Sequence, residues 1–223
     1  MIVEEVTLMN LNKMYGYFDP NDHNEKFNII GCGAIGSHIA EILIRFGITK
    51  INLYDDDIVN EHNITNQLYT TEDLNLPKTE ALKRYLLKIN PEAKITIFGR
   101  YTSQHLSGHV ILAVDSVETR KSILEINKYN EHIKSWSDYR MGLTEAQHFF
   151  YTEPEHLLKT LDFTHEEAMQ NTPISPCGTT LNVCTTVKSI CALGVQNLIH
   201  FLLNKDTIHI ITINLTDISI LKI

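Results

Sequence analysis

Between residues 27 and 138, short apolar runs alternate with longer segments whose apolar residues recur every three or four positions. The short runs are typical of buried strands, and the longer spacing is typical of helices with one buried face. The expected strands are Phe27–Ile30, Ile51–Tyr54, Ile95–Phe98, His109–Val114 and Lys134–Ser137. The expected helices are Ala34–Phe46, Lys78–Lys88 and Thr119–Tyr129. Strands joined through helices predict an α/β fold, with a Rossmann-like, mostly parallel sheet and helices on both faces.

After Asp138 the pattern changes. The elements expected there are a strand at Gln147–Tyr151, at most a short helix within the polar segment Pro154–Pro173, a long apolar helix at Thr179–Leu203, and strands at His209–Asn214 and Ile218–Ile223. The last two strands predict a closing antiparallel hairpin. No stretch resembles a linker, so we expect one domain, 1–223, with a core at 27–138, a crossover segment at 139–178 and a C-terminal helix and hairpin at 179–223.

Composition narrows the function. The net charge of −8 gives no basic footprint, which disfavours a nucleic-acid partner. We find neither a signal peptide nor an apolar run of about 18 residues, so no membrane association is expected. The four cysteines form no C-x-x-C pair, so no structural zinc is expected. Free thiols in a chain of this kind predict a reducing, cytoplasmic location.

A glycine motif follows the first expected strand. It has the form G-x-G-x-x-G, with Gly31, Gly33 and Gly36 as its glycines and Ala34 and Ile35 before the last of them. The first glycine allows a tight turn, the second lets the backbone approach a phosphate, and the third lets helix and strand pack closely. Free N–H groups at the helix N-terminus favour a bound phosphate. The motif therefore predicts nucleotide binding, although it also fits a turn that only packs a helix onto a sheet.

An acidic run, Asp55 to Asp57, ends the second expected strand. A carboxylate at Asp55 suits the hydroxyls of a ribose. This feature fits an ATP enzyme and an NAD(P) oxidoreductase equally well.

Further motifs resemble those of the E1-like adenylyltransferase family, of the ThiF, MoeB and HesA type. The run LYDDDIVNEHNITNQ resembles the family pattern D-x-D, V, N-x-x-R-Q. Its matching positions are Asp55, Asp57, Val59, Asn63 and Gln67.

Two further segments, LPKTEALKRYLLKINP and AVDSVETRKSI, resemble the lysine-bearing helix and the D-x-x-x-x-R segment of the family. Lys78 falls on the lysine that contacts ATP phosphates, Asp115 on the acid linked to magnesium and ATP, and Arg120 on the arginine that follows. Taken alone, Lys78 also fits a solvated lysine in a first helical turn, and Asp115 also fits a helix N-cap. The later segments look nearest to a compact bacterial and phage branch of the family.

The resemblance implies an ATP-dependent adenylyltransferase. Its substrate would be a carboxylate, such as the C-terminus of a ubiquitin-like or sulfur-carrier-like small protein, and the product an acyl-adenylate. It also implies Mg²⁺ held by Asp115, and a homodimer.

One position departs from the family. Asn66 stands where the family has an arginine that contacts the phosphates, and an asparagine carries no charge. Arg120, Arg140 or Lys78 could compensate. Without compensation, the chain would be a non-catalytic ATP-binding subunit that partners an active protein.

Many relatives pass the adenylate to a cysteine. Cys177 is the candidate, because it follows the polar crossover segment and precedes a helix, where the thiol pKa falls. It also fits a tight turn before that helix. Cys32 is expected to be structural, and Cys184 and Cys191 are expected to be small buried residues of that helix. The histidines are expected to be surface or incidental residues.

Overall fold

The structure, a computed structural model, describes residues 9–169, 173–174 and 181–223. Its centre is an eight-stranded sheet with the order β3-β2-β1-β4-β5-β6-β7-β8. The strands are β1 Phe27–Ile30, β2 Lys50–Tyr54, β3 Lys94–Phe98, β4 Gly108–Leu112, β5 Ile133–Met141, β6 Glu145–Tyr151, β7 Ile210–Asn214 and β8 Ser219–Lys222. Pairs from β3 to β5 are parallel, and pairs from β5 to β8 are antiparallel. The predicted Rossmann-like half and the closing hairpin are confirmed.

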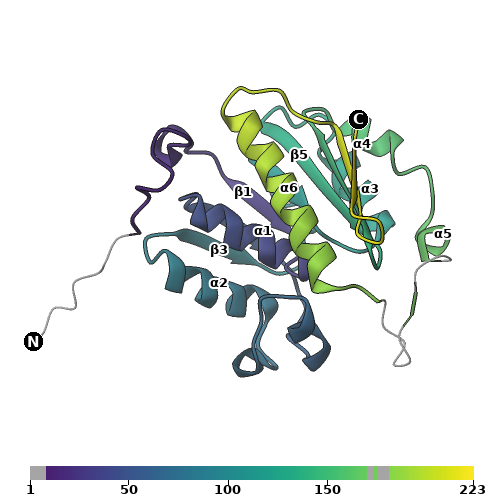
Figure 1. The fold of residues 1–223 in the computed structure, drawn as a ribbon, viewed down its shortest axis with the longest axis horizontal. Coiled ribbons are helices and arrows are strands. Elements are labelled where there is room, and N and C mark those ends of the chain that lie inside the picture. The colour runs from purple at the N-terminus through teal and green to yellow at the C-terminus, as the bar shows by residue number, and fades with distance from the viewer. Residues whose placement is uncertain (1–8, 170–172, 175–180) are drawn as a thin grey trace, which may run out of the picture.

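Helices cover both faces of this sheet (Figure 1). They are α1 Ala34–Arg45, α2 Lys78–Ile89, α3 Val117–Ile126, α4 Pro154–Lys159, α5 His165–Met169 and α6 Cys184–Leu202, with short 3₁₀ turns η1 Pro20–Asp22, η2 Glu61–Thr65 and η3 Thr71–Asp73. The helices α1, α2 and α6 enclose one apolar core with the sheet. The helices α3 and α4 enclose a second core on the opposite face. Two separate cores explain why the central strands are apolar on both sides.

Some boundaries differ from the prediction. The strand β5 continues to Met141 rather than ending at Ser137, so the expected core boundary at Asp138 falls inside a strand. The sequence pattern did not predict the end of β5, because Asp138 is buried there by residues that are distant in sequence. The long helix begins at Cys184 rather than Thr179, since Val183 has an extended backbone. Two short helices, α4 and α5, occupy the segment where at most one was expected.

Close contact fixes α6 against the sheet. A Cβ atom added to Gly194 would lie 2.3–2.6 Å from three atoms of the Tyr139 side chain. Tyr139 is buried, so its ring has no room to move aside. The glycine therefore sets how near α6 approaches β5.

The strand order changes direction at β1. The chain passes from β1 through α1 to β2 on one side, then returns to β4 on the other side of β1. The connections diverge there, and ligands of open α/β sheets bind outside the carboxyl ends of strands at such a point. Gly31 follows β1, Asp55 follows β2 and Asp115 lies just past β4, so three predicted site residues meet at this edge, which we call the carboxyl edge.

Candidate functional site

The three glycines of the turn between β1 and α1 have three different surroundings. Gly31 has φ of 97°, and a Cβ there would lie 2.5 Å from the carbonyl oxygen of Ala113, at the end of β4. A Cβ on Gly36 would lie 1.8 Å from the carbonyl oxygen of Gly31. A Cβ on Gly33 would meet nothing within 4 Å. The first and third glycines are therefore required by packing, whereas the second opens onto free space.

The N-terminus of α1 faces this space. Gly33 is its N-cap and supplies no capping side chain. The first N–H groups of the helix have no partners within the helix, and with the helix dipole they form a site for an anion. The arrangement fits a phosphate group, with room for its approach at Gly33.

Asp55 holds the glycine turn in place. One carboxylate oxygen accepts a hydrogen bond from the N–H of Cys32 at 2.6 Å, and the other accepts from the N–H of Asp57 at 2.8 Å. Burial raises the pKa of Asp55, and these hydrogen bonds oppose the rise. Cys32 is buried, as expected for a structural residue. The expected contact of Asp55 with a ribose stays a prediction.

Lys78 is the first residue of α2 and is almost completely buried. Its ammonium lies 2.8 Å from a carboxylate oxygen of Asp57, and its N–H donates to the carbonyl of Asp57 at 2.9 Å. The alternative of a solvated lysine is therefore wrong. The hydroxyl of Tyr69 donates to the carbonyl of Cys32 at 2.6 Å and lies 3.3 Å from that of Lys78. Tyr69 thus joins the glycine turn to the lysine, which no sequence signal indicated.

The segment from Asn63 to Gln67 lies against α1. The side-chain oxygen of Asn63 accepts from the N–H of Asn60 at 2.9 Å and so caps η2. The ring Nε2 of His38 lies 3.1 Å from the carbonyl oxygen of Asn66. The side-chain oxygens of Asn66 and Gln67 are buried and have no partner among the described residues. Buried acceptors of this kind call for a donor from water or a ligand.

The histidines were expected to be surface or incidental residues, and three of them, His38, His109 and His148, are buried rather than at the surface. Burial lowers their pKa values, to about 4 for His109 and about 3 for His148. Cys191 is buried as expected, whereas Cys184 is partly exposed at the start of α6. Cys177 lies outside the described residues.

Asp115 is exposed at the carboxyl edge, and its carboxylate has no hydrogen bond to another described residue. It is not the N-cap of α3: that position belongs to Ser116, whose side chain accepts from the N–H of Thr119. Asp115 is therefore available to a ligand, though no hydrogen bond joins it to Lys78. Oxygen ligands of this type suit Mg²⁺. Among the described residues, the only group of three potential metal ligands within 4.8 Å of one another is Asp55, Asp56 and Asp57.

A buried carboxylate connects two of the candidate arginines. Asp138 is fully buried in β5 and accepts from Nε of Arg120 and from Nε of Arg140, each at 2.8 Å. Arg120 also donates to the carbonyl of Asp115 at 3.2 Å. Arg140 also donates to the carbonyl and hydroxyl of Thr160. We call Arg120, Asp138 and Arg140 the arginine–carboxylate triad; both arginines are used within the fold.

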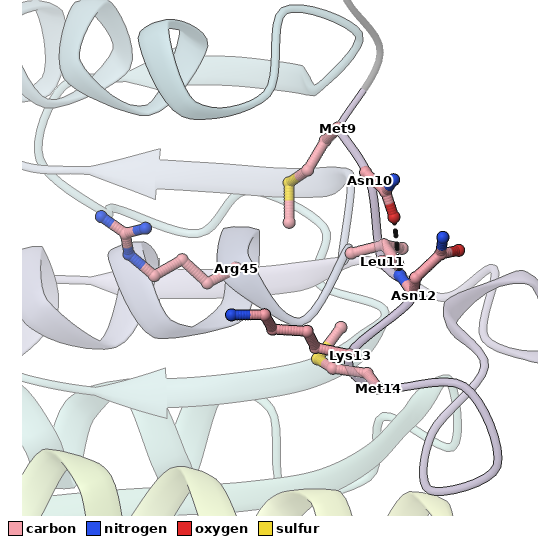
Figure 2. Close-up of a pocket in the computed structure, with 7 residues that line it drawn as sticks. All are labelled: Met9, Asn10, Leu11, Asn12, Lys13, Met14 and Arg45. Carbon is pink, nitrogen blue, oxygen red and sulfur yellow. Dashed lines mark hydrogen bonds between the residues drawn. The ribbon is translucent and has the colours of Figure 1, made fainter.

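Two hollows lie in the described surface. One, of about 510 Å³, is beside η2 and is lined by Val59, Asn60, Glu61, His62, Leu74 and Asn75. The other, of about 410 Å³, is lined by Met9–Met14 and Arg45 at the end of α1 (Figure 2). Only Val59 among the family-matched residues lines either hollow. The candidate site is instead assigned from the residues that meet at the carboxyl edge.

Comparison with known proteins identifies the family. The model of the ThiF family matches residues 23–222. The chain belongs to the ThiF family. Its placement in the compact bacterial and phage branch of the family stays a prediction.

Relatives within this family include two from Escherichia coli (strain K12). The sulfur carrier protein ThiS adenylyltransferase is 34% identical over 103 residues, covering 43% of this chain and 41% of the relative. The tRNA threonylcarbamoyladenosine dehydratase is 31% identical over 112 residues, covering 46% and 42%. The crystal structure of E. coli MccB with AMPCPP and MccA superposes with a TM-score of 0.68 and 21% identity, covering 90% of this chain and 63% of that one. The chain therefore spans less than two thirds of the length of each.

No helix in the described part of the chain combines the length and apolar character needed to cross a membrane.

Proposed function

We propose that this chain is an ATP-dependent adenylyltransferase that activates a carboxylate as an acyl-adenylate. The observation that carries the proposal is the uncapped N-terminus of α1, which opens onto free space at Gly33. The hydroxyl of Tyr69 joins this turn to the backbone of Lys78, whose ammonium is held by Asp57. Membership in the ThiF family and the matched motifs support ATP over a dinucleotide. An NAD(P) oxidoreductase has only the glycine motif and Asp55 in its favour.

The reaction is the attack of a carboxylate oxygen on the α-phosphorus of ATP. A new P–O bond forms, the bond to the β-phosphate oxygen breaks, and pyrophosphate leaves. The N–H groups at the start of α1 bind phosphate oxygens, and Lys78 neutralises part of their charge. Mg²⁺ held by Asp115 would screen phosphate charge. Asn63 and Gln67 offer uncharged hydrogen bonds.

The non-catalytic subunit remains the second candidate, because a specific observation favours it. Asn66 lacks the charge of the family arginine, and the three residues that could replace it are already paired. Lys78 pairs with Asp57, and Arg120 and Arg140 pair with Asp138. A partner protein would then supply the missing cation.

The acceptor we propose is the C-terminal carboxylate of a small carrier protein. Relatives named for ThiS, and the MccB structure with MccA, support a polypeptide substrate. The relative named for a tRNA nucleoside suggests another carboxylate, but the net charge of −8 disfavours a nucleic-acid partner. We further propose a homodimer, which light scattering tests: a mass near the 25.5 kDa of one chain at micromolar concentration would refute it. A thioester at Cys177 stays a prediction.

The decisive experiment is ATP–pyrophosphate exchange with candidate carrier proteins. Asp115→Ala and Lys78→Ala should each weaken Mg-ATP binding and exchange, because each removes a charge from the phosphate site. Lys88→Ala, an exposed lysine at the far end of α2, is the matched control. Exchange and binding at the control level in both site variants would contradict the proposal. ATP binding without exchange, across all carriers, would favour the non-catalytic subunit.

A further inference from the structure

The first turns of α6 lie at the carboxyl edge, beside the start of α1 (Figure 1). Two contacts locate them. The hydroxyl of Thr186 donates to the carbonyl of Leu143 at 2.8 Å, just past the end of β5. The thiol of Cys191 lies 3.5 Å from the carbonyl oxygen of Ile35, in the first turn of α1. The part of α6 between Thr186 and Cys191 therefore passes the start of α1, where the phosphate site is proposed.

Lys188 lies between them. It is one turn, about 4.5 Å along the helix axis, before Cys191, and residues three apart share a helix face. It is exposed and makes no ion pair or hydrogen bond with another described residue. A second observation places Lys188 near α1. The pKa of His38, which is in α1, is lowered mainly by burial, and the positive charge of Lys188 lowers it further. The ring of His38 in turn contacts the carbonyl of Asn66.

The other cations that described contacts place at this edge are already matched with carboxylates. Lys78 pairs with Asp57 and Arg100 with Asp56. Both arginines of the arginine–carboxylate triad share Asp138. The edge also carries the exposed carboxylate of Asp115. A polyphosphate bound at α1 therefore enters a region with little spare positive charge, and needs more than the helix N-terminus supplies.

We propose that Lys188 binds the polyphosphate tail of ATP and supplies positive charge that the position of Asn66 lacks. This inference rests on the proposed function and deepens it by adding a binding residue from α6. A lysine suits the role because its ammonium is a compact charge on a flexible stem, which reaches a phosphate without fixed geometry. The adenosine portion of the nucleotide makes no use of this charge.

Calorimetric titration of the full chain with Mg-ATP and with AMP tests the proposal. Lys188→Gln should weaken ATP binding about ten-fold or more, because a charge-assisted contact is lost. AMP affinity should change far less, since AMP lacks the tail. Lys188→Arg keeps the charge and should retain ATP binding. Lys88→Gln makes the same charge change on an exposed helical lysine away from this edge and should match the wild type.

Each result has one meaning. A wild type that binds ATP, with a Lys188→Gln variant that binds it equally well, overturns the role of Lys188 and leaves the proposed function intact. Equal losses for ATP and AMP also overturn it, because they indicate a general disturbance of the site. A wild type that binds no ATP overturns the proposed function as well. Thermal melting of Lys188→Gln at the wild-type temperature confirms that the variant is folded.

Discussion

Replacing Asp138 by asparagine tests whether the arginine–carboxylate triad stabilises the fold. The carboxylate of Asp138 is fully buried and accepts from two guanidinium groups at 2.8 Å each. Asparagine has nearly the same shape, so the variant changes charge without creating a cavity. It leaves two largely buried cations facing a neutral amide.

The expected loss follows from that geometry. Breaking a buried ion pair by removing one partner costs about 3–5 kcal/mol, because the remaining charge is buried without compensation. In a chain of this length, that loss lowers the melting temperature by about 6–20 °C. The ion pair of Asp56 with Arg100 is the internal control, since the two side chains are 49% and 74% exposed. Asp56→Asn should change stability by less than about 1 kcal/mol.

Urea unfolding followed by circular dichroism measures both variants. A loss for Asp138→Asn as small as that for Asp56→Asn would refute the reasoning, because the triad would then behave like a surface pair. A second readout links stability to the site. Arg120 donates to the carbonyl of Asp115, so Asp138→Asn should also weaken Mg-ATP binding by displacing the loop that carries Asp115.

Three other changes have defined outcomes. Gly36→Ala should strongly destabilise the chain, because the added Cβ would lie 1.8 Å from the Gly31 carbonyl oxygen. Gly33→Ala should melt near the wild-type temperature, because a Cβ there meets no protein atom within 4 Å, yet lose ATP binding. Equal melting temperatures for the two variants would contradict this. Acidification from pH 7 to pH 5 should cost about 2 kcal/mol through His148, because its folded pKa of about 3 lies below the usual value, so only the unfolded chain takes up the proton. His148→Phe should flatten that part of the stability profile, and an unchanged slope would assign the effect elsewhere. Asn66→Arg should raise ATP affinity or exchange about ten-fold if a missing charge limits the site; lower activity beside robust wild-type exchange would show that asparagine belongs to a working site.

The parallel half of the fold could be read from the sequence because its strands are buried on both faces. Such strands are short, mostly apolar runs, and the expected ends of β1 and β4 lie within two residues of the observed ones. The end of β5 beyond Ser137 was missed because Asp138 and Tyr139 are buried, although the sequence pattern assigns a charged residue such as Asp138 to the surface. Their burial depends on neighbours distant in sequence, which periodicity does not report.

The site divides in the same way. The glycine turn and Lys78 belong to local motifs, so the sequence located them. Tyr69 and His38 act across the fold, one joining the glycine turn to α2 and the other contacting Asn66. Nothing in their local sequence signals these contacts. They form because the loop between β2 and α2 packs against α1 and the glycine turn.

The contact of Gly194 with Tyr139 limits which substitutions the two positions can accept during evolution. A methyl group at position 194 and the tyrosine ring at position 139 claim the same space. Overpacking of this kind is relieved only if the partner shrinks or the helix shifts. The two positions, 55 residues apart, are therefore not free to vary independently. In an alignment of chains that share this packing, an alanine at position 194 should accompany a side chain smaller than tyrosine at position 139. The order of substitution also matters, because Tyr139 must be replaced by a smaller residue before Gly194 can be replaced by a larger one.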